Sequence, residues 1–125
     1  MDIILVDDDP IVILIQKKLM EKAGISHQII SFNNGEEVLD FLEKKESGNK
    51  YLLFLDINMP GLSGWEVLDE LESKDIPFDL RVIIITSSIE DADRFKAKSY
   101  DRVEDFWVKP FSLNDFTNLK SKFNL

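Results

Sequence analysis

The chain alternates five short apolar runs with five longer segments whose apolar residues recur at helical spacing. The runs are rich in β-branched residues and bounded by turn-forming or charged residues, which predicts a strand at each of them. They occupy residues 2–6, 27–32, 51–55, 81–85 and 104–108. Strands that alternate with helices favour right-handed crossovers with helices on both faces of a parallel sheet. We therefore expect an α/β fold with a doubly wound five-stranded parallel sheet, in the order 2-1-3-4-5, and five helices.

The segments between the runs contain helix starts and apolar faces. Pro10 directly follows Asp9, which predicts a helix that starts at the proline after a carboxylate cap. We expect one face of this helix to consist of Ile11, Leu14, Ile15, Lys18 and Leu19. Residues 90–99 predict a polar helix that packs loosely. The weak apolar face of that helix consists of Ala92, Phe95 and Ala97.

Length and composition exclude several classes of protein. A chain of 125 residues fits one compact domain and is too short for a second, so we expect no output domain. The net charge of -9 and the pI near 4.5 disfavour binding to nucleic acid. Cysteine is absent, which excludes disulfides and thiolate chemistry. No apolar run reaches the roughly 18 residues of a membrane-spanning helix, and we expect a cytoplasmic monomer.

Polar side chains stand where four of the predicted strands end. Asp7 and Asp8 follow the first strand and Asp56 follows the third. Thr86 follows the fourth strand and Lys109 the fifth. The carboxyl ends of parallel strands meet at one edge of the sheet, where open α/β folds bind their ligands. These side chains are therefore predicted to form a single site.

The residue types at this predicted site favour phosphoryl chemistry. Carboxylates that lie together repel one another, and a site that keeps several of them ionised commonly holds a divalent cation. Oxygen ligands select Mg²⁺, or Mn²⁺, over zinc. Magnesium usually takes one or two protein carboxylates together with phosphate oxygens. The ammonium of Lys109 and the hydroxyl of Thr86 suit the oxygens of a transferred phosphoryl group.

Four motifs occur in order along the chain. They are ILVDDDP (4–10), LFLDINMPGLSG (53–64), IIITSS (83–88) and WVKPF (107–111). In this combination the chain resembles the receiver domain of two-component response regulators, of the stand-alone chemotaxis or phosphorelay type. The resemblance covers the whole chain and implies the flavodoxin-like receiver fold.

The resemblance implies specific roles for the acidic residues. Asp56 is expected to be the phosphoacceptor, which takes a phosphoryl group from a phosphohistidine on a sensor histidine kinase or a histidine phosphotransferase. Asp8 and Asp56 are expected to bind Mg²⁺ directly, with the backbone carbonyl of Asn58 as a third ligand and Asp7 acting largely through water. The only enzymatic activity expected is self-catalysed phosphorylation and dephosphorylation.

The resemblance also implies a switch. Thr86 is expected to hydrogen-bond the phosphoryl group and Lys109 to pair with it, and a cis peptide bond is expected before Pro110. The inward motion of Thr86 frees space for an aromatic residue three positions before the lysine. This motion changes the face formed by the fourth helix, fifth strand and fifth helix, through which a downstream protein target binds or relay proceeds.

The chain departs from the family pattern at the residues that are expected to pass the signal to a partner. The switch aromatic is usually tyrosine and is Phe106 here, which has no hydroxyl to bond a partner or the backbone. The preceding segment KSYDRVED (98–105) lacks the Gly-Ala pair common in the family. Asn58 and Ser88 occupy the positions that flank the path of hydrolytic water in the family, where small polar residues leave access open.

A phosphatase of the haloacid dehalogenase type is a competing interpretation. Asp7, Asp9 and Ile11 loosely match the DxDx(T/V) opening of that family. Only Asp115 follows Lys109 as an acidic residue, whereas that family normally has a further acidic pair and a larger core with a cap.

Two more interpretations concern binding alone. A degenerate receiver that binds partners without phosphorylation is compatible with Phe106. A flavodoxin-like nucleotide binder is disfavoured because no Gly-rich loop follows the first strand. His27 is the only histidine and is interpreted as a surface residue, not as an internal phosphoryl donor.

Overall fold

Helices and strands alternate along the whole chain in the computed structural model, which describes residues 1–87 and 90–125. The strands are β1 (Asp2–Val6), β2 (Ile29–Phe32), β3 (Lys50–Asp56), β4 (Asp79–Thr86) and β5 (Val103–Val108). The helices are α1 (Pro10–Lys22), α2 (Gly35–Glu43), α3 (Gly64–Glu72), α4 (Asp91–Ala97) and α5 (Leu113–Lys122). Within the described ranges, none of these helices has the length and apolar character needed to cross a membrane.

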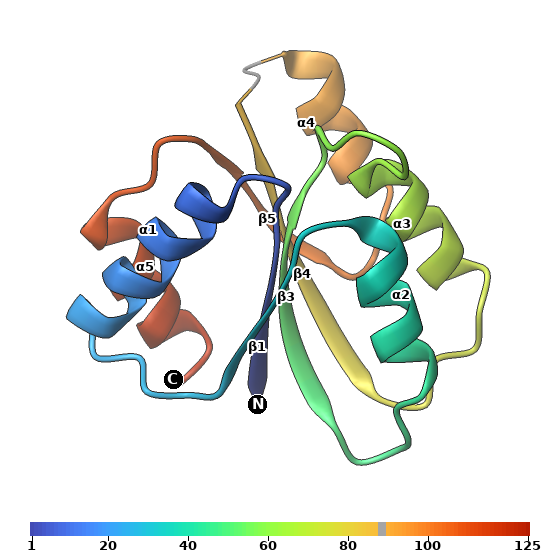
Figure 1. The fold of residues 1–125 in the computed structure, drawn as a ribbon, viewed down its shortest axis with the longest axis horizontal. Helices are drawn as coiled ribbons and strands as arrows, with labels where there is room; N and C mark the ends of the chain where they lie inside the picture. Colours follow the sequence, from blue (N-terminus) through green and yellow to red (C-terminus); the bar gives the residue numbers. More distant parts are fainter. Residues whose placement is uncertain (88–89) are drawn as a thin grey trace.

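The strands form one parallel sheet in the order β2-β1-β3-β4-β5 (Figure 1). This confirms the order predicted from the sequence. Each of β3 and β4 extends one residue beyond its predicted end, so that Asp56 and Thr86 are the last residues of their strands. All five strands therefore present their carboxyl ends at the same edge of the sheet.

The helices cover the two faces of the sheet unequally. α1 and α5 lie on one face, and α2, α3 and α4 lie on the other (Figure 1). Alternate residues of β3 point to opposite faces. Leu52 and Phe54 belong to the core beneath α1 and α5. Leu53 and Leu55 belong to the core beneath α2 and α3. The central strand is thus buried on both sides, as its continuous apolar run predicted.

The start of α1 is as predicted, but its buried face is not. Asp9 caps the helix, since its Oδ1 accepts a hydrogen bond from the backbone N–H of Ile11 at 2.9 Å. Ile11, Leu14 and Ile15, which were predicted to share one face of the helix, do not point into the core, because they are 65%, 54% and 46% exposed. The residues that α1 buries are Ile13, Gln16 and Met20. Five consecutive apolar residues at positions 11–15 surround the helix, so their spacing does not define one face.

The short α4 packs loosely, as predicted. Ala97 is its one buried residue, which agrees with the weak apolar face. Phe95 does not belong to that face, because its side chain is 78% exposed. The loop that leads into α5 is fixed by a capping box, in which Ser112 and Asp115 each accept from the other's backbone N–H.

Candidate functional site

Asp56 lies buried at the carboxyl end of the central strand. Its Oδ1 accepts a hydrogen bond from the backbone N–H of Asn58 at 3.0 Å, and its Oδ2 lies 3.4 Å from Nζ of Lys109. Burial raises the pKa of Asp56 to about 6, and the charge of Asp7 acts in the same direction. The hydrogen bond from Asn58 and the charge of Lys109 oppose this rise. A strongly perturbed carboxyl in a crevice is typical of a reactive group.

Lys109 supplies the positive charge of the site. Its Nζ lies 2.9 Å from Oδ2 of Asp7, and its backbone N–H donates to the carbonyl of Thr86 at 2.8 Å. Burial acts to lower the pKa of Lys109, but the carboxylates of Asp7 and Asp56 outweigh it and raise the pKa above its ordinary value. The peptide bond between Lys109 and Pro110 is cis, as expected.

The three aspartates predicted to converge do so. Asp7, Asp8 and Asp56 each place one carboxylate oxygen within 4.8 Å of the others. Asp7 and Asp56 are buried, whereas Asp8 is exposed. Oδ1 of Asp7 accepts the backbone N–H of Asp9, while its Oδ2 pairs with the Lys109 ammonium. Each carboxylate has two oxygens with several lone pairs, so this cluster of oxygen donors fits a hard divalent cation such as Mg²⁺.

Thr86 ends β4 beside Asp56 and is fully buried. Its Oγ1 accepts a hydrogen bond from Nδ2 of Asn58 at 2.8 Å. This side-chain contact was not predicted from the sequence, which pointed to the backbone carbonyl of Asn58 and to the access of water beside it. The predicted adjacency of β3 and β4 could have indicated this contact, because a polar residue that follows β3 lies close to the end of β4.

The site is divided between the two faces of the sheet. Asp56 has the same parity in β3 as Phe54, which packs beneath α1 and α5. Thr86 has the same parity in β4 as Ile84, which packs beneath the helices of the opposite face. Alternation along the strands therefore turns the carboxylate and the hydroxyl toward opposite sides. Lys109 lines a groove with Val12 of α1, on the same side as Asp56.

The family model for the response regulator receiver domain matches residues 3–120. The chain belongs to this family. The family accounts for both the fold and the acidic crevice, since receiver domains are phosphoacceptor signalling modules of two-component systems and typically bind Mg²⁺ at an acidic pocket. Membership also implies interaction with a histidine kinase or a phosphotransfer partner.

Individual relatives of this receiver domain are distant in sequence. The probable methanogenesis regulatory protein FilR2 of Methanothrix harundinacea is 28% identical over 116 residues, which cover 90% of this chain and 74% of that protein. Several curated relatives are longer, and this chain spans between 33% and 57% of their length.

Solved structures of receiver domains confirm the fold. A CheY-like receiver domain protein from Methanospirillum hungatei has a TM-score of 0.76 at 28% identity, with 98% of this chain and 92% of that chain covered. A two-component response regulator from Cytophaga hutchinsonii has a TM-score of 0.83 at 28% identity, with 99% and 97% covered.

Membership in the receiver family disfavours a phosphatase of the haloacid dehalogenase type, and the position of the Asp9 side chain also disfavours it. The exposed side chain of Asp9 is engaged as the cap of α1, and the metal-compatible cluster contains Asp7, Asp8 and Asp56 instead. Ser88, which was expected beside the path of water, lies outside the residues that the structure describes.

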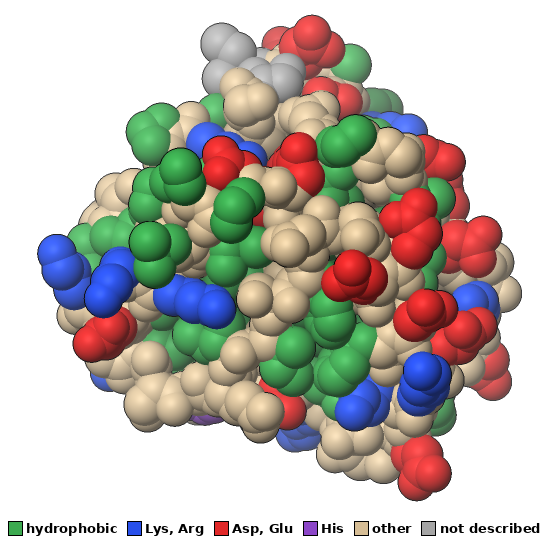
Figure 2. Space-filling view, viewed as in Figure 1, with side chains coloured by type: hydrophobic (Ala, Val, Ile, Leu, Met, Phe, Trp, Pro, Cys, Tyr) green, Lys and Arg blue, Asp and Glu red, His purple; other side chains and the backbone are tan. Residues whose placement is uncertain are grey.

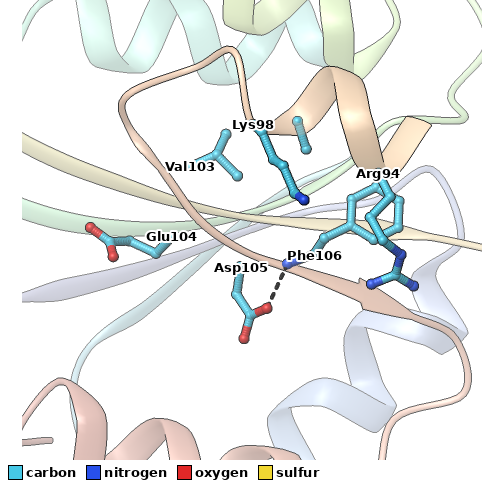
Figure 3. Close-up of a pocket in the computed structure, with 7 residues that line it drawn as sticks. Arg94, Lys98, Val103, Glu104, Asp105 and Phe106 are labelled. Atoms are coloured by element: carbon cyan, nitrogen blue, oxygen red, sulfur yellow. Dashed lines mark hydrogen bonds between the residues drawn. The ribbon is translucent and has the colours of Figure 1, made fainter. Parts of the chain in front are cut away.

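Phe106 borders a pocket between α4 and β5. The guanidinium carbon of Arg94 lies 4.9 Å from the centre of the Phe106 ring, within the range of a cation–π contact. Figure 3 shows Arg94 of α4 and Lys98, which directly follows α4, on the side of this ring, while Glu104 and Asp105 point away from it. The pocket has a volume of about 380 Å³. In this receiver domain a cation therefore contacts the ring that takes the place of the usual tyrosine.

Proposed function

We propose that Asp56 is the residue that accepts the phosphoryl group in this receiver domain. The observation that carries the proposal is the setting of its carboxylate, which is buried beside the carboxylates of Asp7 and Asp8 and within 3.4 Å of the Lys109 ammonium. A pKa of about 6 leaves about nine-tenths of the Asp56 carboxyl ionised at pH 7. A nucleophile is thus present at neutral pH.

The reaction that this setting supports is transfer from a phosphohistidine. An oxygen of Asp56 attacks the phosphorus atom, a P–O bond forms, and the P–N bond breaks with its electron pair remaining on the imidazole nitrogen. The product is an acyl phosphate on Asp56. The positive charge of Lys109 offsets the negative charge of the phosphoryl oxygens, and the hydroxyl of Thr86 donates a hydrogen bond to one of them.

We further propose that Asp7, Asp8 and Asp56 hold Mg²⁺, or Mn²⁺ in its place. Asp8 and Asp56 are the direct carboxylate ligands, the backbone carbonyl of Asn58 is a third ligand, and Asp7 contributes largely through water. The bound ion supplies positive charge that neutralises phosphoryl oxygens. Support comes from the proximity of the three carboxylates, two of which are buried.

Intact-mass measurement tests the acceptor assignment. Wild type incubated with acetyl phosphate and Mg²⁺ should gain one phosphoryl group that is stable in acid and labile in base. Asp56→Asn should gain none, whereas Asp9→Asn, which removes a neighbouring exposed carboxylate, should still be labelled. Equal labelling of wild type and Asp56→Asn would show that the acceptor is another residue. The same samples should not sustain hydrolysis of p-nitrophenyl phosphate, because the site acts on its own aspartate.

The surface beside Lys109 supports a proposal for where the phosphodonor protein binds. Ile11, Leu14 and Ile15 are the large exposed apolar side chains of α1, and Figure 2 shows hydrophobic side chains gathered over this helix. A groove of about 150 Å³, lined in part by Ile15 and Lys109, joins these residues to the site. Exposed apolar clusters of this kind mark protein interfaces, and this one places a donor beside the acceptor.

A comparison of two donors tests this docking surface. Leu14→Glu should lower the rate of transfer from a phosphorylated histidine phosphotransferase by about tenfold, because loss of a half-buried apolar contact costs about 1.4 kcal/mol. It should leave labelling by acetyl phosphate unchanged. Phe95→Glu is the matched control, since it adds the same charge to an exposed apolar position on α4. Equal effects of the two variants on protein-to-protein transfer would contradict the assignment.

We propose that the signal leaves through the surface formed by α4, β5 and α5, which binds a downstream protein target or supports onward relay. Motion of Thr86 toward a phosphoryl group frees space into which the Phe106 ring can turn, and this turn removes it from Arg94. Aromatic NMR resonances of Phe106 should shift when wild type is phosphorylated. They should stay unchanged when Asp56→Asn receives the same treatment, and a shift in both proteins would refute the coupling.

The proposed working state is a monomer that binds protein partners and not nucleic acid. The formal charge of -9 repels phosphate backbones, and acidic side chains gather over α2 and α3 (Figure 2). Light scattering should give the mass of one chain, about 14.5 kDa, and a mass twice as large would contradict the proposal.

A further inference from the structure

One residue links the two sides of the site. The backbone N–H of Asn58 donates to Oδ1 of Asp56 at 3.0 Å, and the side-chain Nδ2 of Asn58 donates to Oγ1 of Thr86 at 2.8 Å. Asn58 is exposed, whereas Asp56 and Thr86 are buried. The carboxylate on one side of the sheet and the hydroxyl on the opposite side are therefore joined through Asn58.

The polarity of the second hydrogen bond constrains the hydroxyl of Thr86. A hydroxyl has one proton to donate and two lone pairs that accept. An amide nitrogen can only donate, so the Thr86 oxygen is the acceptor in this contact and its proton is directed away from Asn58. The oxygens of a phosphoryl group are strong acceptors, and Thr86 can serve them only as a donor. The contact with Asn58 thus excludes an orientation in which the proton points at Nδ2 of Asn58.

We propose that the side-chain amide of Asn58 is a positioning residue for the phosphoryl-binding hydroxyl of Thr86. It holds Oγ1 through a lone pair and polarises the O–H bond, so that the proton is presented to a phosphoryl group on Asp56. This role belongs to the amide side chain and is separate from that of the Asn58 backbone carbonyl. The inference rests on the proposed function of Asp56 as the acceptor.

A double-mutant cycle tests whether Asn58 acts through the hydroxyl. The four proteins are wild type, Asn58→Ala, Thr86→Val and the double variant, and the readout is the maximal rate of Mg²⁺-dependent labelling by acetyl phosphate. Asn58→Ala should slow labelling about fivefold, the effect of losing one neutral hydrogen bond. In the Thr86→Val background, which has no hydroxyl, the same substitution should change the rate by less than about 1.5-fold. Thr86→Ser keeps the hydroxyl and should restore the sensitivity to Asn58→Ala.

The concentration of Mg²⁺ that gives half-maximal labelling separates the amide from the backbone carbonyl. Asn58→Ala retains the carbonyl and should leave that concentration unchanged. A second readout needs no phosphorylation, because the side-chain ¹H–¹⁵N resonances of Asn58 should shift in Thr86→Val and much less in Thr86→Ser.

The possible outcomes distinguish this inference from the function on which it rests. Equal losses in the wild-type and Thr86→Val backgrounds would overturn the positioning role and leave the acceptor assignment intact. A changed Mg²⁺ requirement in Asn58→Ala would show that the substitution acts on metal binding. That result would also overturn the positioning role. Wild-type protein that takes no phosphoryl group would overturn the proposed function itself.

Discussion

Replacement of Asp56 by asparagine is expected to stabilise the metal-free protein, although it removes the proposed phosphoacceptor. The pKa of Asp56 is raised from 3.8 to about 6, with burial as the largest cause. A carboxyl whose pKa is higher in the folded protein than in the unfolded chain destabilises the fold as the pH rises, because the unfolded chain ionises first. The loss of stability develops between about pH 4 and pH 6.

The magnitude follows from the two pKa values. Their difference, at 1.36 kcal/mol per pH unit, amounts to about 3 kcal/mol at pH 7. About half of this cost, about 1.5 kcal/mol, is already present at pH 5. Asparagine has nearly the shape of the neutral carboxyl and does not ionise. The free energy of unfolding of Asp56→Asn should therefore exceed that of wild type by about 3 kcal/mol at pH 7 and by about 1.5 kcal/mol at pH 5.

Urea unfolding in the presence of EDTA measures this difference. With an m-value of about 1.5 kcal/mol/M, the midpoint should rise by about 2 M at pH 7. Asp8→Asn is the matched control, since it removes the same unit of charge from an exposed position and should shift the midpoint much less. The reasoning fails if Asp56→Asn is destabilised, if its gain does not depend on pH, or if Asp8→Asn shows an equal gain.

Three further changes have defined outcomes. Gly64→Ala should lower the free energy of unfolding, measured in urea, by about 2 kcal/mol. The added Cβ would lie 2.6 Å from the backbone oxygen of Asp56 and 2.6 Å from Cα of Ile57. An unchanged urea midpoint would contradict this prediction. Mg²⁺ at ten times its Kd should raise the Tm of wild type by about 5 °C, and chelation should reverse the rise, whereas an equal rise in Asp56→Asn would exclude the proposed metal site. Lys109→Gln should raise the pKa of Asp56 above about 6, because a neighbouring positive charge is lost. A carboxyl ¹³C NMR titration in which the pKa of Asp56 does not rise would refute this prediction.

The sheet and its order were predictable because buried strands and surface helices leave different periodicities in a sequence. The run at 51–55 is apolar throughout, and only a central parallel strand buries such a run on both faces. The buried face of α1 was not predictable for a related reason. Residues 11–15 are all apolar, so every face of the first turns satisfies the helical pattern. Tertiary packing selected Ile13 and Gln16 for burial.

The candidate site was predictable as far as the backbone determines it. Asp7, Asp56 and Lys109 end or follow parallel strands, whose carboxyl ends share one edge of the sheet, and the three side chains meet there. The hydrogen bond between Asn58 and Thr86 depends instead on side-chain rotamers in a loop, about which strand patterns carry no information. The contact of the Arg94 guanidinium with Phe106 could not be predicted from strand patterns either. One helical turn more or less in the preceding segment would place another residue over the ring.

The division of the site across the sheet has a consequence for the order in which partners bind. Under the proposed docking surfaces, a donor over α1 would approach Asp56 from one side, whereas a target that contacts Phe106 would approach from the side of α4. A target that contacts only α4 and β5 would therefore leave α1 open to the donor. A target that also covers α5 would border the donor surface, because α1 and α5 lie on the same face of the sheet.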